Sequence, residues 1–599
     1  MTDPPTKTAD TTPEEGEAAN LGLIRELVMM TRAIFASPVG KALVLLTITV
    51  VVVIIATAYG QIRLNRWNKP FYDALSRRDL RNFLYQLGVF FLIAGFLLCL
   101  NVAQRWLAET LAVRLREGLV KSLLRDWMQP RQAFWLANSG AIGINPDQRM
   151  HEDARHLTTL SANLGTGLLQ ASILFCTFAS VLWVLSSDIS FRIGDWDYFI
   201  PGFMLWAAIV YAFAGSLLSY WIGRTLIGRN AERYAREADL RFALVRVNEH
   251  VDDISLAQGE ADERRRIELN LGRVLAATRR IVIGETNLTW ITAGFGWVTL
   301  VAPILVAAPL YFTGKISFGG LMMAAGAFTQ AQSSLRWFID NFSAIADWRA
   351  TLLRVASFRH ALITIHEPRG FESRIEYSEG GPGAIAIDNL EIVSSANADM
   401  LKETHAVVKS GERALILAAP GTGKTQLFRA LAGLWPWGAG KITRPGGEQI
   451  FYLPRGTPYL PRGTLREVLA YPLKADTFTA NAFTRALYRL GLERLARFLD
   501  ETHRWDRELS QDEQLCLVFA RILIQAPPWL LIDGTFGSLD EDVLELVIDV
   551  FGNELQRTGI IHIGGPGEAH ALFSTVLHLV KSPRTRHTTP APRELGERR

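Results

Sequence analysis

Long stretches without a charged residue recur through the first half of the chain. A charge inside a lipid bilayer is costly, and about 20 mostly apolar residues cross the hydrocarbon core as a helix. Six stretches approach or exceed this length, at residues 42–62, 82–104, 157–187, 198–223, 286–314 and 316–335. No comparable stretch follows residue 336. The pattern therefore predicts an α-helical membrane domain with six spans, followed by a soluble part.

The segments between these spans indicate a topology. An even number of spans places both termini on one side of the membrane. The segments after the second and fourth spans are long and rich in arginine, whereas the connections at 188–197 and Lys315 carry one cation each. Positive charge gathers on the cytoplasmic side, so we expect both termini there. The basic segment 63–81 falls on the outer side and conflicts with this assignment.

The soluble part follows a different pattern. A Gly/Pro-rich segment, "SRIEYSEGGPG", precedes short apolar runs that alternate with helical segments. Such alternation is typical of an α/β domain. The first 20 residues lack the apolar core of a signal peptide and are expected to be a polar tail. The predicted parts are a disordered tail 1–20, a transmembrane domain 21–345, a linker 346–382, an α/β domain 383–582 and a basic tail 583–599.

Composition narrows the class of protein. Hydrophobic residues make up 49% and charged residues 20%, with a mean hydropathy of +0.14, which together indicate a membrane protein with a soluble portion. The net charge of +4 is spread without long blocks of like charge, so we expect no nucleic-acid partner. The three cysteines are widely separated and match no disulfide or metal framework.

A phosphate-binding loop is predicted from residue 418 to residue 425. In the pattern G-x-x-x-x-G-K-[ST], glycines let backbone N–H groups wrap the phosphates, the lysine neutralises them, and the hydroxyl holds Mg²⁺. Ala418 replaces the first glycine; the remainder is intact and lies between strand-like "RALILA" and helix-like "TQLFRALAGL". The expected nucleotide-binding residues in this segment are Pro420, Gly421, Thr422, Gly423, Lys424, Thr425 and Gln426.

Two later segments complete the pattern. The apolar run "WLLID" ends in Asp533, which is expected to hold Mg²⁺ together with Thr425. In "ELSQDEQLCLVFARILIQAPP", Ser510 is predicted to begin a helix. The order of loop, "LSxxEQ", Asp533 and "SLD" resembles that of ABC transporters. The resemblance implies an exporter-like membrane domain followed by a P-loop NTPase domain, with ATP and Mg²⁺ as cofactors.

The same resemblance implies a dimer. In ABC transporters the signature segment of one subunit closes on the phosphate-binding loop of the other, so one half per chain implies a homodimer or a partner half. By this resemblance Ser510 contacts the γ-phosphate across the dimer, and Asp512, at the second signature glycine, lies close to it.

Several positions depart from the family pattern. Alignment to that pattern places Gly534 at the catalytic glutamate, Gly565 at the switch histidine, and Arg455 or Gly456 at the conserved glutamine. Such groups contribute on the order of 10²- to 10⁴-fold to rate, so we expect a slow ATPase. Gly534 alone is compatible with an engineered trapping mutation, whereas the other departures indicate a native site. His562, on an apolar strand, is interpreted as a packed core residue.

Three further segments narrow the resemblance. They are "LNRWNKPFYDAL" at 64–75, "NPDQRMHEDARHLTTLSANL" at 145–164 and "LAGLWPWGAGKI" at 431–442. They resemble the SbmA/BacA-related peptide-uptake family and the peroxisomal acyl-CoA ABC transporters, over nearly the whole chain from about residue 40 to residue 582. With its own nucleotide domain, the chain is similar to the BacA-like, BclA-type ABC proteins of rhizobia and mycobacteria.

That similarity implies a function. It implies import of antimicrobial or cysteine-rich plant peptides, and of hydrophilic solutes such as bleomycin or cobalamin, across a bacterial inner membrane. The six spans contain no carboxylate, which favours a roomy polar cavity over recognition by charge. Two alternatives stay open: an acyl-CoA or lipid exporter, and an ATP-gated transporter whose degenerate site hydrolyses poorly and whose transport runs on another gradient.

Two of these segments have competing interpretations. Trp67, Phe71 and Tyr72 belong either to an aromatic belt at the membrane interface or to the mouth of the cavity. The segment "NPDQRMHED", with Asp147, Glu152 and Asp153, is interpreted as a turn in a cytoplasmic loop that couples to the nucleotide domain.

Overall fold

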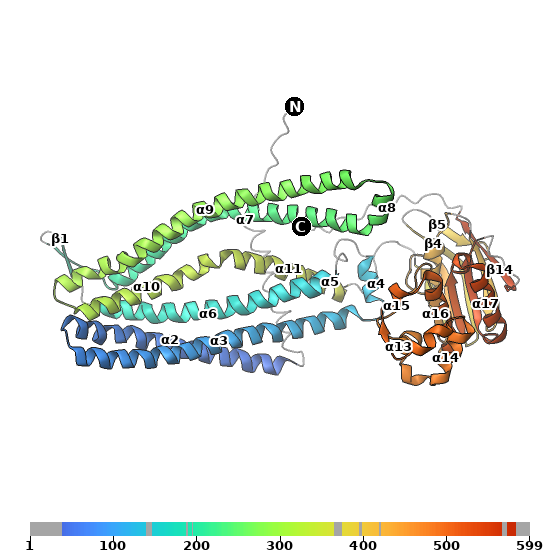
Figure 1. The fold of residues 1–599 in the computed structure, drawn as a ribbon, viewed down its shortest axis with the longest axis horizontal. Helices are drawn as coiled ribbons and strands as arrows, with labels where there is room; N and C mark the ends of the chain where they lie inside the picture. Colours follow the sequence, from blue (N-terminus) through green and yellow to red (C-terminus); the bar gives the residue numbers. More distant parts are fainter. Residues whose placement is uncertain are drawn as a thin grey trace, which may run out of the picture. The chain divides into compact units, whose positions relative to one another are not determined.

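The computed structural model describes residues 39–138, 146–186, 190–193, 196–364, 374–394, 398–418, 421–565 and 572–582. The chain divides into two compact units, with the boundary between His366 and Glu367 (Figure 1). The first unit is helical and the second contains a large mixed sheet. This confirms the predicted order of a helical membrane domain followed by an α/β domain.

Long helices build the first unit. They are α2 (Gly40–Ser76), α3 (Leu80–Trp127), α6 (Ala154–Leu185), α7 (Phe203–Glu249), α9 (Glu260–Phe312) and α10 (Phe318–Asp340). Shorter elements join or follow them: α4 (Gln132–Ala137), α5 (Pro146–Gln148), the π-helical turn η2 (Arg149–Asp153), α8 (Val251–Leu256), α11 (Phe342–Thr364) and the hairpin β1 (Ser190–Ile193) with β2 (Trp196–Phe199). Helix α11 takes up the first part of the segment predicted as a linker.

Each of the six long helices contains most of one predicted span, and most of these helices run well beyond it. Helix α9 has 53 residues, or about 80 Å at 1.5 Å per residue, against a hydrocarbon core of about 30 Å. Within the described residues, four helical segments are long and apolar enough to cross a membrane, and α7 adds the shorter apolar stretch Phe203–Ser219. The four are Gly40–Ser76, Leu80–Trp127, Pro146–Leu185 and Glu260–Phe312.

The predicted start of the fourth span needs a correction. Tyr198 and Phe199 belong to strand β2, which pairs with β1, and the helix begins only at Phe203. Pro201 and Gly202 intervene, and Gly202 adopts a positive φ of 71°, which favours glycine. Apolarity alone cannot separate a hairpin strand from the end of a span.

The helices pack in two sets within this unit. Helix α2 lies along α3, and α7 lies along α9; α10 contacts α2, α6, α7 and α9 and so joins the sets (Figure 1). The core where they meet includes Ala58, Phe178, Leu182, Ala327 and Phe328, each at most 4% exposed. Small residues at such positions let helix backbones approach closely.

The segment "LNRWNKPFYD" forms the contact between α2 and α10. The Asp73 carboxylate accepts the Gly319 amide N–H at 2.8 Å and the Ser317 hydroxyl at 2.9 Å, which satisfies donors at the start of α10. A Cβ on Gly319 would collide with the Lys69 carbonyl oxygen, and one on Gly326 would lie 2.7 Å from the Asn65 side-chain oxygen. The two helices therefore meet backbone to backbone.

Two aromatic residues of the same segment, Trp67 and Phe71, face α3, whereas the Tyr72 ring lies 6.0 Å from that of Phe318 in α10. The Trp67 indole N–H donates to the Gln86 carbonyl oxygen at 2.8 Å, and its ring lies 4.4 Å from that of Phe71 and 5.1 Å from that of Phe90. The Phe71 ring lies 5.0 Å from that of Phe83. Trp67 and Phe71 thus hold α2 against α3, a packing role that neither predicted interpretation contained.

The second unit is built on one long sheet. Its order is β3-β8-β4-β5-β14-β7-β13-β12-β9, with β6 added beside β4. The strands are β3 (Glu376–Gly380), β4 (Ala384–Val393), β5 (Ala398–Leu401), β6 (His405–Lys409), β7 (Arg413–Ala418), β8 (Gly438–Pro445), β9 (Ile450–Leu453), β12 (Trp529–Asp533), β13 (Gly559–Gly564) and β14 (Thr575–Lys581). From β14 to β9 all neighbours are parallel.

Helices and short strands complete this unit. They are α12 (Lys424–Leu431), β10 (Gly463–Thr464), α13 (Leu465–Ala470), η3 (Ala475–Thr477), α14 (Ala480–Arg489), η4 (Glu493–Phe498), β11 (Thr502–His503), α15 (Trp505–Glu508), α16 (Gln511–Gln525), η5 (Phe536–Ser538) and α17 (Glu541–Asn553). Parallel strands covered by helices place ligand sites at the carboxyl edge of the sheet. That edge is where the predicted nucleotide residues lie.

Replacing Gly319 by alanine tests the close contact between α2 and α10. The added methyl group meets the Lys69 backbone, which cannot move aside as a side chain can, so we expect a loss of about 1–3 kcal/mol and a lower unfolding temperature in detergent. Gly88→Ala is the matched control, because its Cβ meets nothing within 4 Å and alanine favours a helix. Equal unfolding temperatures for the two variants would contradict the contact.

Candidate functional site

Four adjacent parallel strands bring the predicted site residues to one edge of the sheet. The strands β7, β13, β12 and β9 are neighbours in this order. Beyond their carboxyl ends follow, respectively, the loop to Lys424, Gly565, Gly534 and Arg455. Lys424 and Gly565 are about 140 positions apart in the sequence, yet parallel strand pairing brings the ends of their strands to the same edge.

The loop between β7 and α12 has the backbone of a tight turn onto a helix. Gly421 adopts a φ of 78°, and Gly423 precedes Lys424, the first residue of α12. Thr425 and Gln426 follow in the first helical turn. Pro420 lies outside the described residues. An amino-terminal helix turn with a lysine is suited to phosphate, because its N–H groups and its dipole both favour an anion.

Two amide groups of this loop already have partners inside the protein. The Gly423 N–H donates to Asp399 Oδ2 at 3.0 Å, and the Lys424 N–H donates to the Thr422 carbonyl oxygen at 2.9 Å. Both N–H groups would have to leave these acceptors before they could donate to a phosphate. The loop therefore holds a carboxylate anion of the protein itself at the Gly423 amide.

That anion, Asp399, is a residue that the sequence did not single out. It lies on β5 and is 2% exposed, and its Oδ1 has no hydrogen-bond partner among the described residues. Burial raises the pKa of Asp399, while the Gly423 N–H and the Lys581 cation oppose the rise. In the sequence, the only indication of this role is a single aspartate in the apolar strand "ADML". The pairing of neighbouring strands is what places it beside the loop.

Asp533 is positioned to support a cation. It is the last residue of β12 and is 2% exposed. Burial raises the pKa of Asp533; the opposing influences are, in order, the Arg455 charge, a hydrogen bond from the Thr425 hydroxyl and the Lys424 charge. A hydroxyl and a carboxylate side by side are hard oxygen donors of the kind Mg²⁺ prefers, so Thr425 and Asp533 suit that ion.

Gly534 has a backbone that disfavours a side chain. Its φ is 60°, in the left-handed region, and its N–H donates to the Ile563 carbonyl oxygen of the neighbouring strand at 2.8 Å. Gly565 comes directly after β13 on the same edge. The two positions assigned to the catalytic glutamate and the switch histidine thus both lie beside Asp533 and carry no side chain.

His562 is buried in the α/β unit, as its apolar strand indicated. It is 0% exposed, and its ring lies 4.7 Å from that of Phe536 and 5.6 Å from that of Phe573. A ring stacked in this way packs in the core.

The signature segment forms a capped helix start. The Ser510 hydroxyl accepts the Glu513 N–H at 3.2 Å, and the Glu513 carboxylate accepts the Ser510 N–H at 3.0 Å, ahead of α16. Asp512 lies in the first turn. Burial raises the pKa of Asp512, and the Asp540 carboxylate raises it further through its charge and a shared hydrogen bond. Two acidic groups therefore lie together beside Ser510.

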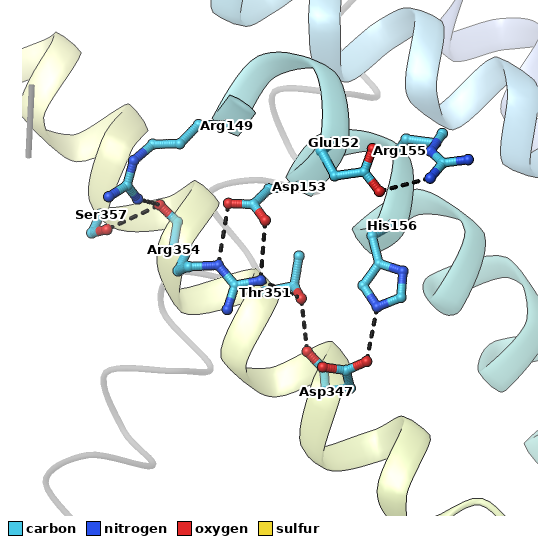
Figure 2. A network of polar contacts seen from close by, with 9 residues as sticks. All are labelled: Arg149, Glu152, Asp153, Arg155, His156, Asp347, Thr351, Arg354 and Ser357. Atoms are coloured by element: carbon cyan, nitrogen blue, oxygen red, sulfur yellow. Dashed lines mark hydrogen bonds and ion pairs between the residues drawn. The ribbon is translucent and has the colours of Figure 1, made fainter. Parts of the chain in front are cut away.

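A polar network in the helical unit centres on the segment "NPDQRMHED". Figure 2 shows η2 and α6 facing α11. The Asp153 carboxylate accepts two hydrogen bonds from Arg354, at 3.2 Å from Nε and 3.0 Å from Nη2. Arg354 Nη2 also donates to the Thr351 hydroxyl at 3.0 Å, and His156 Nε2 lies 2.9 Å from Asp347 Oδ2. Asp153 is buried, at 7% exposed.

This network joins two segments about 200 residues apart. Arg149 adds a hydrogen bond to the Arg354 carbonyl oxygen at 3.1 Å (Figure 2). Asp147 and Glu152 are exposed, and Glu152 pairs with Arg155 of its own turn. Helix α11 is the last described helix before the α/β unit in the chain, and the Asp153–Arg354 pair joins it to the segment predicted to couple the domains, which forms the helical turns α5 and η2.

The chain matches two family descriptions. "ABC transporter transmembrane region 2" matches residues 30–312, and "ABC transporter" matches residues 401–537. Among solved structures, a bacterial Atm1-family ABC exporter with ATP bound matches with a TM-score of 0.71 at 16% identity, over 90% of this chain and 94% of that chain. The likeness confirms the exporter-like fold.

Known proteins of similar length resemble the chain across both units. It is 26% identical to the inner membrane ABC transporter ATP-binding protein YddA of Escherichia coli, over 90% of this chain and 95% of that protein. It is 27% identical to the chloroplastic ABC transporter D family member 2 of Arabidopsis thaliana, over 81% of this chain and 76% of that protein. It is 25% identical to the lysosomal cobalamin transporter ABCD4 of Homo sapiens, over 85% of this chain and 87% of that protein.

The Asp153–Arg354 pair predicts that removing one partner costs more stability than removing the other. Arg354→Met leaves the buried Asp153 charge unpaired, so we expect a loss of about 1–3 kcal/mol; Asp153→Asn leaves a half-exposed arginine that water can solvate and costs less. Arg155→Met, in an exposed pair, is the control and leaves the unfolding temperature unchanged. Thermal unfolding in detergent measures all three, and an equal loss for Arg354→Met and Arg155→Met would refute the role.

The position of Asp399 predicts that its carboxylate competes with phosphate for the Gly423 N–H. Asp399→Asn keeps an oxygen acceptor for the Gly423 N–H but removes a negative charge, so we expect ATP to bind about 3- to 10-fold more tightly, consistent with a charge interaction on the order of 1 kcal/mol. Protonation of Asp399 removes the same charge. Wild-type affinity should therefore rise, relative to the variant, as pH falls through the raised pKa. Titration with fluorescent ATP measures both effects; weaker binding by the variant would show that Asp399 supports the site instead.

Proposed function

Because this chain is an ABC transporter that joins a transmembrane region to an ATP-binding domain in one polypeptide, we propose that two copies form a transporter gated by ATP. It imports peptides and other hydrophilic solutes across a bacterial inner membrane. The observation that carries the gating role is the convergence of Lys424, Thr425 and Asp533 at an edge where Gly534 supplies no carboxylate.

Different residues at this edge bind different parts of ATP and its metal ion. Lys424 neutralises phosphate charge, and Thr425 and Asp533 hold Mg²⁺, the aspartate through water. Bound Mg²⁺ supplies charge neutralisation to the phosphates. Ser510 of one copy contacts the γ-phosphate held by the other. Since no side chain at Gly534 or Gly565 can take a proton from water, the site holds ATP for long periods and hydrolyses it slowly.

The arrangement of α7 and α9 supports a homodimer. Within the described part of the helical unit these helices pack mainly on each other and on α10, and they diverge from α2 and α3 (Figure 1). Large apolar side chains on α9 are exposed, among them Trp290 at 78%, Trp297 at 76% and Leu300 at 70%. Such surfaces pack against lipid or against a second membrane subunit.

The proposed cargo rests on resemblance and on one relative. The segments shared with peptide-uptake proteins support peptides, and the human relative named as a cobalamin transporter supports a hydrophilic cargo. The exporter-like fold also supports the rival, an acyl-CoA or lipid exporter. Gly534 supports a further variant of the proposal, in which ATP binding sets the conformation while another gradient drives transport.

Uptake of a fluorescent cationic peptide by cells that express the chain tests the proposal. We expect uptake by the wild type and a loss of at least about tenfold in Lys424→Ala, because phosphate binding needs that charge. Lys474→Ala, an exposed lysine of the same unit, is the control and keeps full uptake. No uptake by the wild type contradicts peptide import and favours the exporter. Uptake that needs Lys424 but collapses with an uncoupler identifies a gradient as the driving force.

A further inference from the structure

Arg455 lies next to the position that lacks the catalytic carboxylate. Strand β9 pairs with β12 so that Leu453 is opposite Ile532, and Arg455 and Gly534 each follow two residues later. A Cβ built on Gly534 would lie 3.7 Å from Arg455 Cδ and 3.9 Å from Arg455 Nε. These are van der Waals distances, so the arginine side chain borders the space that a glutamate would enter.

The Arg455 guanidinium has no direct partner among the residues that the structure describes. It is exposed, and in the described part of the chain it makes no hydrogen bond and no ion pair. Its charge nevertheless acts on Asp533, where it is the strongest influence that lowers the pKa of that carboxyl against burial. Arg455 therefore lies within electrostatic reach of the residue expected to support Mg²⁺.

The phosphate chain of a bound nucleotide runs along the same edge. The loop before α12 is suited to the inner phosphates, and Thr425 and Asp533 would hold Mg²⁺, which would neutralise charge on the outer phosphates. A γ-phosphate near Asp533 would then be within reach of Arg455, whose charge already acts on that carboxyl. ADP lacks that group and would leave Arg455 without an anion.

We propose that Arg455 binds the γ-phosphate of ATP, so that the site retains ATP in preference to ADP while lacking a base to cleave it. This rests on the proposed function, in which the loop at Lys424 binds ATP. A guanidinium donates paired hydrogen bonds to phosphate oxygens and stays charged at any physiological pH. For the same reason it cannot accept a proton from water. Arg455 strengthens binding without providing general-base catalysis.

The same geometry bears on the origin of Gly534. A glutamate there would need the left-handed backbone that L side chains rarely adopt, and its carboxylate would meet the Arg455 side chain. The two charges would pair, and the carboxylate would be less basic toward water. An arginine at position 455 and a glycine at position 534 are thus compatible with each other. This compatibility favours a native site without glutamate over a single engineered substitution at position 534.

The main test compares ATP and ADP binding by the purified full-length dimer. Equilibrium titration with fluorescent ATP and ADP, in the presence of Mg²⁺, is applied to wild type, Arg455→Ala and Arg455→Lys. We expect Arg455→Ala to weaken ATP binding about tenfold or more and ADP binding less than twofold, with partial recovery in Arg455→Lys. Arg462→Ala, an exposed arginine of the same connection, is the control and changes neither affinity.

The outcomes separate the two proposals. Consider first that wild type binds ATP and that Lys424→Ala abolishes this binding. If Arg455→Ala then weakens ATP and ADP binding equally, or weakens neither, the role of Arg455 is refuted while the proposed function stands. If wild type does not bind ATP, or if Lys424→Ala binds as well as wild type, the proposed function fails and the role of Arg455 fails with it.

Phosphate release provides a second measurement. Gly534→Glu alone should raise the rate less than about threefold, because Arg455 pairs with the new carboxylate. The double variant Arg455→Gln with Gly534→Glu should exceed that single variant at least about fivefold. A single variant as fast as the double would show that Arg455 does not mask a carboxylate at position 534.

Discussion

A buried carboxylate at the edge of a parallel sheet organises the α/β unit. Asp533 is nearly inaccessible to water, and an isolated charge in such a place would be very costly. Its compensation comes from the Thr425 hydroxyl and from the charges of Arg455 and Lys424. Those groups reach it only because β7, β12 and β9 are parallel and end at the same level. The strand order is thus what surrounds the buried carboxylate with these groups, and a carboxylate beside a hydroxyl suits a cation such as Mg²⁺.

The residues at this edge fit phosphate and a metal better than they fit general-base catalysis. Lys424, Thr425 and Asp533 are groups of the kind that bind phosphate and Mg²⁺, whereas Gly534 and Gly565 at the same edge carry no side chain that could take a proton. The Asp399 carboxylate accepts the Gly423 N–H of the loop. In the proposed function, a nucleotide would compete with this carboxylate on entry and would meet no base at either glycine. Both features suit the proposed switch, which changes state when ATP binds, better than a motor that consumes ATP rapidly.

In the helical unit, polar groups mark the contacts between helices. Asp73 satisfies the start of α10 at the point where two glycines allow backbones to touch, and Asp153 receives the arginine of α11. These polar contacts specify which helix surfaces meet, because a buried partner that is left unpaired is penalised. Apolar packing alone would tolerate several registers. The segments that resembled a transporter family are therefore, in this chain, largely the segments that fix helix pairing.

The chain alone determined the order of the domains, the six apolar stretches, the glycine-rich turn that leads into α12, the helix start at Ser510 and the burial of His562. All of these depend on composition or on spacing within about 20 residues, which a local pattern can carry. It did not reveal Asp399 at Gly423, Arg354 at Asp153, Asp73 at Gly319 or Arg455 at Gly534. Each of these joins segments from 24 to about 250 residues apart, and no local pattern records which strands or helices become neighbours. Only the tertiary structure, through strand order and helix packing, decided what surrounds the predicted site.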